Sequence, residues 1–438
     1  MCMRRQRFQL GLIHVAVAMT AVPVDSTLNR IMIKELSLSA TLVAVLVTLP
    51  YLFSPIQVAI GSFADRNPIF GRRRTPYIVV GLILSALGIA IAPTGAFLIE
   101  TSQAAGIGIS LLGFGVWGMG FNFATVSYFS LASELSGEQG SSQTISTMYV
   151  MMIISVIFTG ITLSRLVEPY SPEVVTNGIW LVSSVALVLG LLGTIGLEPH
   201  AFKPEKTDSQ IPVKTMMRSL ADNRQAVLFF GYLILLLAAV LGQDVLLEPY
   251  AGETFNMSVS ETTRLTSIYG VCFLITLATA ALLEKRTNKR TVAHIGTWGA
   301  IAAFGVLILG GMLYSIAIFY LGVILLGLAI GLATVSNHSL MLDMTTVKNV
   351  GLFIGAWGMA TSFARLVGSL IGGVVRDAID QLTTNPAIPY MIAFGLNIIL
   401  LLVSLALLHQ VNVTHFRLEA AEGEGTEEKR PSFTKQPL

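Results

Sequence analysis

Charged residues are scarce in this chain. Asp, Glu, Lys and Arg make up 12% of its 438 residues, and the formal net charge is +2. Without an acidic or basic excess, the composition does not favour a nucleic-acid partner. Cysteine is scarce as well, since the chain has Cys2 and Cys272 alone. With no CxxC pair and no thiolate cluster, we expect neither a zinc or iron–sulfur centre nor a disulfide framework.

Motifs for catalysis and nucleotide binding are also missing. No lysine follows a glycine, so there is no Walker A loop, and no HExxH motif, nucleophile elbow or metal-spaced cluster occurs. The stretch GFGVWG at 113–118 matches GxGxxG, but no strand precedes it. Glycines within such an apolar run favour close helix packing. We therefore predict no enzyme activity, no metal site and no intrinsic cofactor.

Hydrophobic residues, in contrast, are abundant. They make up 53% of the chain, and the mean hydropathy is +0.73, well above that of ordinary soluble domains. This composition predicts an integral membrane protein with many spans. The opening MCMRRQRFQLGLIHVAVAMTA has the basic and then apolar order of a signal peptide. Because the apolar run continues through Val24 and many more follow, we interpret it as an uncleaved first span.

Polar and Pro/Gly-rich breaks divide the chain into twelve apolar segments, each near the roughly 20 residues that a helix needs to cross the hydrocarbon core. Backbone groups cannot stay unpaired in lipid, and the segments lack the alternation of barrel strands. The predicted fold class is therefore an all-α membrane protein with twelve transmembrane helices. The predicted spans are 8–33, 38–64, 75–99, 104–134, 141–167, 176–197, 224–250, 261–283, 291–313, 316–344, 350–378 and 388–410.

The basic residues predict the orientation of these spans. Most of the 27 Lys and Arg lie at the N-terminus, in the loops after even-numbered spans and in the tail, beginning with Arg4 and Arg5. The positive-inside rule then places both termini in the cytoplasm. The longest polar connection separates six helices from six. The predicted domains are an N-terminal bundle (1–197), a cytoplasmic linker (198–223), a C-terminal bundle (224–410) and a disordered cytoplasmic tail (411–438).

The two halves share an internal repeat. ATVSYFSLASEL (124–135) and ATVSNHSLMLDM (333–344) agree at six of twelve positions, at an offset of 209 residues. Elsewhere the offset is 219, and it pairs Asp25 with Asp244, Asn29 with Glu248 and Asp65 with Glu284. Parallel six-helix repeats of this kind resemble the major facilitator superfamily. The resemblance implies a 6+6 pseudo-twofold fold with a substrate site near the midplane, between the halves.

The charged turn between spans 2 and 3, GSFADRNPIFGRRRTP at 61–76, resembles the signature loop of that superfamily. We predict a conformational latch, in which Asp65 caps a helix N-terminus across the interface of the halves and the arginines pair with carboxylates. The alternative is that the arginines only anchor the loop at the cytoplasmic face. The NPIF insertion lengthens the usual spacing. The predicted latch residues are Gly61, Asp65, Arg66, Gly71, Arg72, Arg73, Arg74 and Glu134.

Two stretches, FGRRRTPYIVVG at 70–81 and STLNRIMIKEL at 26–36, resemble the PucC type of the bacteriochlorophyll delivery family. The resemblance implies a protein of the cytoplasmic or photosynthetic (intracytoplasmic or thylakoid) membrane that delivers (bacterio)chlorophyll and assists assembly of light-harvesting complexes. The implied partners are the lipid bilayer, a tetrapyrrole pigment and light-harvesting antenna polypeptides. The molecule implied to be bound is (bacterio)chlorophyll.

Polar groups inside spans 1 and 7 are candidates for a cavity or substrate site, because ionisable side chains in a membrane are costly. Asp25, Asn29 and Arg30 lie about one helical turn apart, and Asp244 and Glu248 share one face of span 7. In a symporter the carboxylates would bind protons. In a pigment carrier they would pair with arginine and hold the halves together. The alternative is a hydrated, structural role at the outer interface.

Arg365 lies near the middle of span 350–378, too deep for its side chain to reach the membrane surface easily. It should face protein and find an acid. We predict an ion pair across the cavity with Asp25 or Glu248, and the alternative is a structural pair that is partly buried.

His14 in span 1 and His338 in span 10 complete the set of candidates. Neutral imidazole is a natural axial ligand for the magnesium of chlorophyll, whereas a lone histidine inside a membrane protein more often packs and forms hydrogen bonds. Two further functions stay open. One is a proton-coupled sugar or small-solute symporter with proton sites at Asp25, Asp244 or Glu248. The other is an antenna assembly scaffold that transports nothing.

Overall fold

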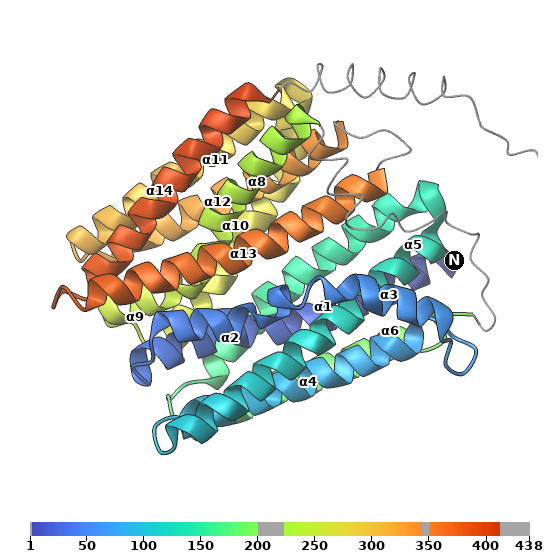
Figure 1. Ribbon diagram of the computed structural model, residues 1–438, viewed down its shortest axis with the longest axis horizontal. Helices are drawn as coiled ribbons and strands as arrows, with labels where there is room; N and C mark the ends of the chain where they lie inside the picture. Colours follow the sequence, from blue (N-terminus) through green and yellow to red (C-terminus); the bar gives the residue numbers. More distant parts are fainter. Residues whose placement is uncertain (1, 200–222, 344–349, 412–438) are drawn as a thin grey trace, which may run out of the picture.

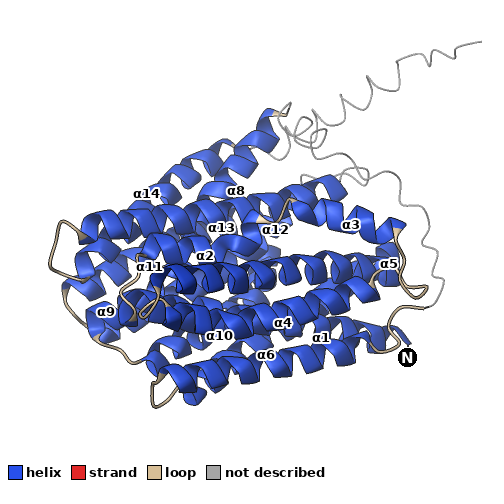
Figure 2. Ribbon diagram, turned by 60° about the horizontal axis from the view of Figure 1, so that its bottom comes forward, coloured by secondary structure: helices blue, strands red, loops and turns tan. Residues whose placement is uncertain are grey.

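The computed structural model describes residues 2–199, 223–343 and 350–411, and nearly all of them are helical (Figures 1 and 2). The first half contains α1 (Cys2–Pro23), η1 (Val24–Leu28), η2 (Ile31–Glu35), α2 (Ala40–Leu52), α3 (Ile56–Arg66), α4 (Thr75–Leu98), α5 (Gln103–Leu166) and α6 (Pro172–Thr194). The second half contains α8 (Arg224–Gly242), η3 (Gln243–Val245), α9 (Leu247–Phe255), α10 (Val259–Arg286), α11 (Lys289–Met312), α12 (Ile316–Asp343), α13 (Val350–Asp380) and α14 (Ala387–Gln410).

Ten helical segments in the described part of the chain are long and apolar enough to cross a membrane. This confirms the predicted fold class, an all-α membrane protein. The predicted spans 38–64 and 261–283 fall on α2 with α3 and on α10, which are not among the ten. The count of twelve crossings therefore stays a prediction. The predicted linker and tail lie almost wholly outside the described residues.

Two helices depart from simple spans for reasons that the sequence contains. The α5 ribbon joins predicted spans 4 and 5 without a loop, and the direction changes at Gly137, whose φ of 61° and ψ of 177° are open to glycine. Span 2 is divided at 53–55, where Pro55 lacks the amide that would continue α2 into α3. The bend gives α3 a separate direction toward the loop at 67–74.

The helices end at two faces. The N-terminus and the turn at 67–74 lie at one face, which we call the N-terminal face, and the connections at 36–39 and 381–386 lie at the other, which we call the distal face. In Figure 1 the ribbons of the two halves run close together near α9, at the distal face, and diverge toward the end marked N.

Buried apolar side chains form separate cores in the two halves. One cluster is drawn entirely from the second half, between Ala226 and Val411. A second cluster is built on η1, η2 and α2, and it also includes Val245 and Val259 from the second half. The halves therefore share an apolar contact where α2 meets η3 and where η1 meets the start of α10.

Close backbone contact joins α4 to α5. A Cβ atom built on Gly88 would lie 2.2 Å from the backbone nitrogen of Trp117, and one built on Gly120 would lie 2.3 Å from that of Ser85. The predicted use of the GFGVWG region in helix packing fits this geometry, since small residues let membrane helices approach closely. Gly115, on the same helix, has no atom within 4 Å of such a Cβ.

This difference predicts opposite effects for two identical substitutions. Gly120→Ala should lower the free energy of unfolding by about 1–3 kcal/mol, because the methyl group forces α4 and α5 apart. Gly115→Ala should leave stability unchanged or raise it by up to about 1 kcal/mol, since alanine favours a helix and meets nothing. Thermal unfolding of both variants in the same detergent tests this. Equal melting temperatures would contradict the packing account.

Candidate functional site

The two halves meet at a charged cluster around Arg365 of α13. Its Nη2 donates to Oδ2 of Asp25 at 2.9 Å and lies 3.1 Å from Oδ2 of Asp244. Asp25 belongs to the first half and Asp244 to the second, so one guanidinium bridges them. The arginine side chain is 16% exposed and the two carboxylates about a quarter. At such burial the ion pairs are screened less than surface pairs, and each partner depends on the others.

Local breaks in two helices bring these carboxylates to the interface. Asp25 lies in the π-helical turn η1, which directly follows Pro23. Asp244 lies in the 3₁₀ turn η3, where Pro249 in α9 lacks the amide that would continue the hydrogen-bond ladder. Such departures from α geometry inside a helix are frequent at functional sites. They occur here at positions that the internal repeat makes equivalent.

Neutral groups complete the surroundings of Arg365. Its guanidinium carbon lies 4.9 Å from the centroid of the Tyr51 ring, within range of a cation–π contact. Gln243 Nε2 donates to Asp244 Oδ1 at 2.7 Å, and Asn29 Nδ2 donates to the Asp244 carbonyl at 2.9 Å. Asn29 belongs to the first half and Gln243 to the second, so Asp244 accepts hydrogen bonds from both halves.

Glu248 lies one turn beyond Asp244 and is buried, with 5% of its surface exposed. Its Oε1 is 3.4 Å from the hydroxyl of Thr266, and its Oε2 has no hydrogen-bond partner among the described atoms. Two carboxyl groups, on Asp25 and Asp244, thus share the guanidinium of Arg365, and the carboxyl group of Glu248 lies one turn further along the chain. This excess of acid over base makes a bound proton the simplest way to balance the charge.

The sequence analysis offered Asp25 or Glu248 as the partner of Arg365. Asp25 is a partner, but Asp244 takes the place expected for Glu248. Arg30 does not join this cluster. It forms an ion pair with Glu35 and donates to the Met257 carbonyl at 2.8 Å.

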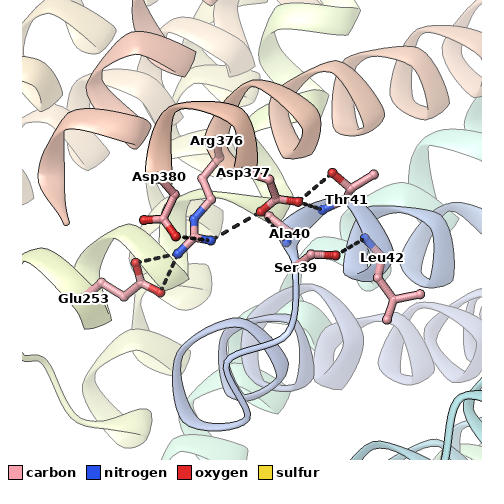
Figure 3. Close-up of polar contacts among 8 residues, drawn as sticks. All are labelled: Ser39, Ala40, Thr41, Leu42, Glu253, Arg376, Asp377 and Asp380. Carbon is pink, nitrogen blue, oxygen red and sulfur yellow. Dashed lines mark hydrogen bonds and ion pairs between the residues drawn. The ribbon is translucent and has the colours of Figure 1, made fainter. Parts of the chain in front are cut away.

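A second set of contacts closes the distal face, where Asp377 of α13 binds the N-terminus of α2 (Figure 3). Its carboxylate accepts from the amides of Ala40 and Thr41 at 2.8 Å each and from the Thr41 hydroxyl at 2.6 Å. The Ser39 hydroxyl accepts from the next amide, that of Leu42, at 3.2 Å. Two free amides of the first turn, which carries the positive end of the helix dipole, are thus satisfied by the other half, and a third is satisfied by Ser39.

Arg376 extends this distal clasp, by which we mean Asp377, Arg376 and Glu253 together with the first turn of α2 (Figure 3). Arg376 Nη2 lies 3.0 Å from both carboxylate oxygens of Glu253 on α9, and its Nη1 lies 3.3 Å from Asp377. Lys34 of η2 adds a bond to the Gly252 carbonyl at 2.5 Å. The distal clasp therefore ties α9 and α13 of the second half to η2 and α2 of the first.

The predicted latch loop lies at the N-terminal face, and part of its predicted pairing is present. Arg74 Nη2 lies 2.8 Å from Glu134 Oε1. Glu198, which the sequence analysis missed, accepts from the backbone amides of Arg73 at 2.7 Å and Thr75 at 2.7 Å, at the start of α4. These contacts lie within the first half. The side chain of Asp65 is outside the described set, so its pairing across the halves stays a prediction.

The NPIF insertion forms a tight turn within this loop. Ile69 and Arg72 exchange backbone hydrogen bonds of 2.9 and 3.0 Å, while Phe70 and Gly71 have φ values of 52° and 71°. Positive φ at both central positions is typical of a type I′ turn. Gly61 offers its carbonyl to Arg74 at 3.5 Å, and Arg66 is exposed.

The two candidate histidines differ sharply in access. His14 is buried, with Nε2 3.0 Å from the sulfur of Met152 and rings of Tyr128, Phe129 and Tyr149 around it. His338 is exposed, and its ring lies 4.0 Å from that of Trp357. Within the described ranges, no group of three or more His, Cys, Asp or Glu is arranged to hold a metal ion.

A family model described as PUCC protein matches residues 27–416. The chain belongs to the PucC family. Protein PucC of Cereibacter sphaeroides is 29% identical over 412 residues, which cover 90% of this chain and 88% of that protein. The bacteriochlorophyll synthase 44.5 kDa chain of Rhodobacter capsulatus is 28% identical over 408 residues, covering 91% of this chain and 93% of that one. The family resemblance drawn from two short stretches is thus confirmed.

Solved transporters share the fold of this PucC-family chain. A bacterial homologue of the human lysosomal transporter Spinster matches with a TM-score of 0.74 at 13% identity, over 94% of this chain and 97% of that one. A D-xylose–proton symporter matches with a TM-score of 0.69 at 13% identity, over 92% and 97%. At such identities the likeness shows the fold alone, which this chain shares with solved membrane transporters.

Sequence reasoning about this PucC-family chain overlooked the distal clasp. Asp377 and Glu253 lie near predicted span ends, where charged residues usually face water, so their roles were not apparent. A usable signal existed in Ser39, a favourable N-cap residue directly before the apolar run that begins at Ala40. An N-cap residue marks a helix N-terminus, but it does not reveal that a distant carboxylate also binds there.

Removing the central cation should destabilise the PucC-family protein strongly. Arg365→Leu leaves Asp25 and Asp244 facing each other without a counter-charge and should cost about 3 kcal/mol or more of unfolding free energy. Adding Asp25→Asn should restore part of the loss, because it removes one unpaired charge. Thermal unfolding in detergent measures both, with the exposed Arg165→Leu as the control. A double variant less stable than Arg365→Leu would contradict the ion-pair assignment.

Breaking the distal clasp should loosen the contact between the halves. Asp377→Ala removes the acceptor for Ala40 and Thr41 and should cost about 1–2 kcal/mol, as loss of a helix cap does. Spin labels at the exposed Ser37 and Thr384 should report a longer and broader distance distribution. Asp380→Ala is the matched control, because Asp380 is 44% exposed and lies 3.4 Å from Arg376. An equal effect from the control variant would count against the clasp.

Proposed function

We propose that this chain binds (bacterio)chlorophyll in the membrane and hands it over during assembly of light-harvesting complexes. The observation that carries the proposal is the PucC family match over residues 27–416. One relative is named as a bacteriochlorophyll synthase chain, which links that protein to the pigment. The proposed partners are a tetrapyrrole pigment and antenna polypeptides.

The proposed role is delivery without catalysis. The chain has no Walker A loop and no nucleophile or metal-binding motif, so nothing in its sequence favours bond-making chemistry or ATP hydrolysis. A pigment with a long apolar tail is soluble in the bilayer, where a helical carrier can receive it. The proposed setting is the cytoplasmic or photosynthetic membrane, with both termini in the cytoplasm, as the distribution of Lys and Arg favours.

Two sets of contacts support a carrier whose halves move relative to each other. The distal clasp and the Arg365 cluster join the halves toward one face, while the ribbons diverge toward the other. A protein whose halves are joined toward one face can alternate between two arrangements. Bound pigment would shift the equilibrium between these arrangements if its affinity for them differs. The latch loop at 61–76 would then bias the same equilibrium from the N-terminal face.

A proton-coupled symporter is the second candidate, and one observation favours it. Asp25 and Asp244 share the guanidinium of Arg365, and Glu248 Oε2, one turn beyond Asp244, has no partner among the described atoms. Such an excess of carboxyl groups suits proton binding. Proton-linked uptake of a small solute into vesicles would support this function, whereas antenna binding without pigment would support a scaffold.

The test of pigment delivery is an absorption spectrum of the tagged protein, purified gently from a pigment-synthesising host. An unrelated twelve-span membrane protein, purified in the same way, is the control. We expect pigment in stoichiometric amount above that control. Pigment at the control level would contradict the proposal and favour the scaffold or the symporter.

A further inference from the structure

The further site is centred on His338, near the end of α12 that faces the N-terminal side. Every side chain between 325 and 341 is described, and His338 is the single exposed residue in that range. The rest of this stretch is buried or half-buried in an apolar bundle. The imidazole of His338 is therefore exposed on a stretch of helix whose other side chains are buried or half-buried.

One hydrogen bond determines which nitrogen of His338 is free. Nδ1 lies 2.9 Å from the carbonyl oxygen of Thr334, one turn earlier in α12. A carbonyl oxygen can only accept, so the proton of the neutral ring resides on Nδ1. Nε2 then carries the lone pair. A histidine that binds a metal commonly donates its other N–H to a backbone carbonyl in this way, which fixes the ring and strengthens the ligand.

An aromatic ring packs against the imidazole of His338. The Trp357 ring of α13 lies 4.0 Å from the His338 ring at an interplanar angle of 41°. A flat apolar macrocycle held at Nε2 would find the aromatic ring of Trp357 to contact.

The internal repeat shows that this arrangement is peculiar to the second half. The offset of 209 residues pairs His338 with Phe129, which has no ligating atom. Phe129 is packed against His14 and Tyr149, with ring centroids 5.5 and 6.4 Å away. His14 itself is 5% exposed, and its Nε2 already faces Met152. The position in the first half that is equivalent to His338 is thus packed among aromatic rings, whereas His338 in the second half is exposed.

We propose that His338 Nε2 is the axial ligand for the magnesium of a tetrapyrrole, with Trp357 as its aromatic contact. The inference rests on the proposed pigment function and assigns a site to it. Magnesium in a tetrapyrrole has an open axial position, and neutral imidazole with a free lone pair can fill it. His14 is not this ligand, because its surroundings leave no room for a macrocycle.

The experiment titrates the purified protein in detergent with a magnesium chlorophyllide and, separately, with its metal-free counterpart. Wild-type protein should bind the magnesium form about tenfold or more tightly, since ligation adds to apolar contact. His338→Phe should remove this preference, and His409→Phe, which changes another exposed histidine, should keep it. In His338→Gly, added imidazole should restore the coordination signature in the resonance Raman spectrum. Size-exclusion profiles check that each variant folds.

The possible results distinguish failure of the His338 ligand assignment from failure of the proposed pigment function. A preference for the magnesium form that survives in both His338 variants would overturn the ligand assignment and leave pigment binding intact. Equal binding of the two forms by wild-type protein would also overturn it. Binding of neither form by wild-type protein would overturn the proposed function together with the site.

Discussion

The arrangement of this molecule depends on one guanidinium shared between two carboxylates of different halves. Arg365 lies 2.9 Å from Asp25 and 3.1 Å from Asp244, and the internal repeat makes those two acids equivalent. A charge in a membrane is tolerated when it is paired, so neither half can move away without leaving a costly unpaired group. The interface is therefore specified by electrostatics as well as by apolar packing, and its opening requires that the charges be rearranged or neutralised.

The distal clasp adds a second constraint on the same pair of halves. Asp377 satisfies the free amides at the start of α2, so the end of one helix is completed by a residue of the other half. Both sets of contacts lie on α13, which carries Arg365 and Arg376 three turns apart. Movement of α13 is the natural route by which events near Trp357, on the same helix, would reach the distal face.

Much of this architecture was predictable because it rests on long apolar runs and on helix-breaking residues. The change of direction at Gly137 and the polar loops match predicted boundaries, and the offset of 219 residues pairs Asp25 with Asp244 in the sequence itself, whereas the predicted span 38–64 runs through the break at Pro55. The second partner of Arg365 was harder to predict from the sequence. Asp244 and Glu248 lie one turn apart, and the 3₁₀ turn at 243–245 determines which carboxylate faces the arginine. Likewise, exposure separates His14 from His338, and exposure depends on tertiary packing that a single sequence does not contain.

The proposed delivery requires that bound pigment leave this chain for an antenna polypeptide, and such a transfer can be observed. The most direct measurement follows the absorption spectrum after pigment-loaded protein is mixed with pigment-free antenna polypeptides in lipid vesicles. The account predicts that the band of the carrier falls while the band of the assembled antenna rises at a matching rate. A carrier band that stays constant, or an antenna that forms equally fast from free pigment, would contradict it.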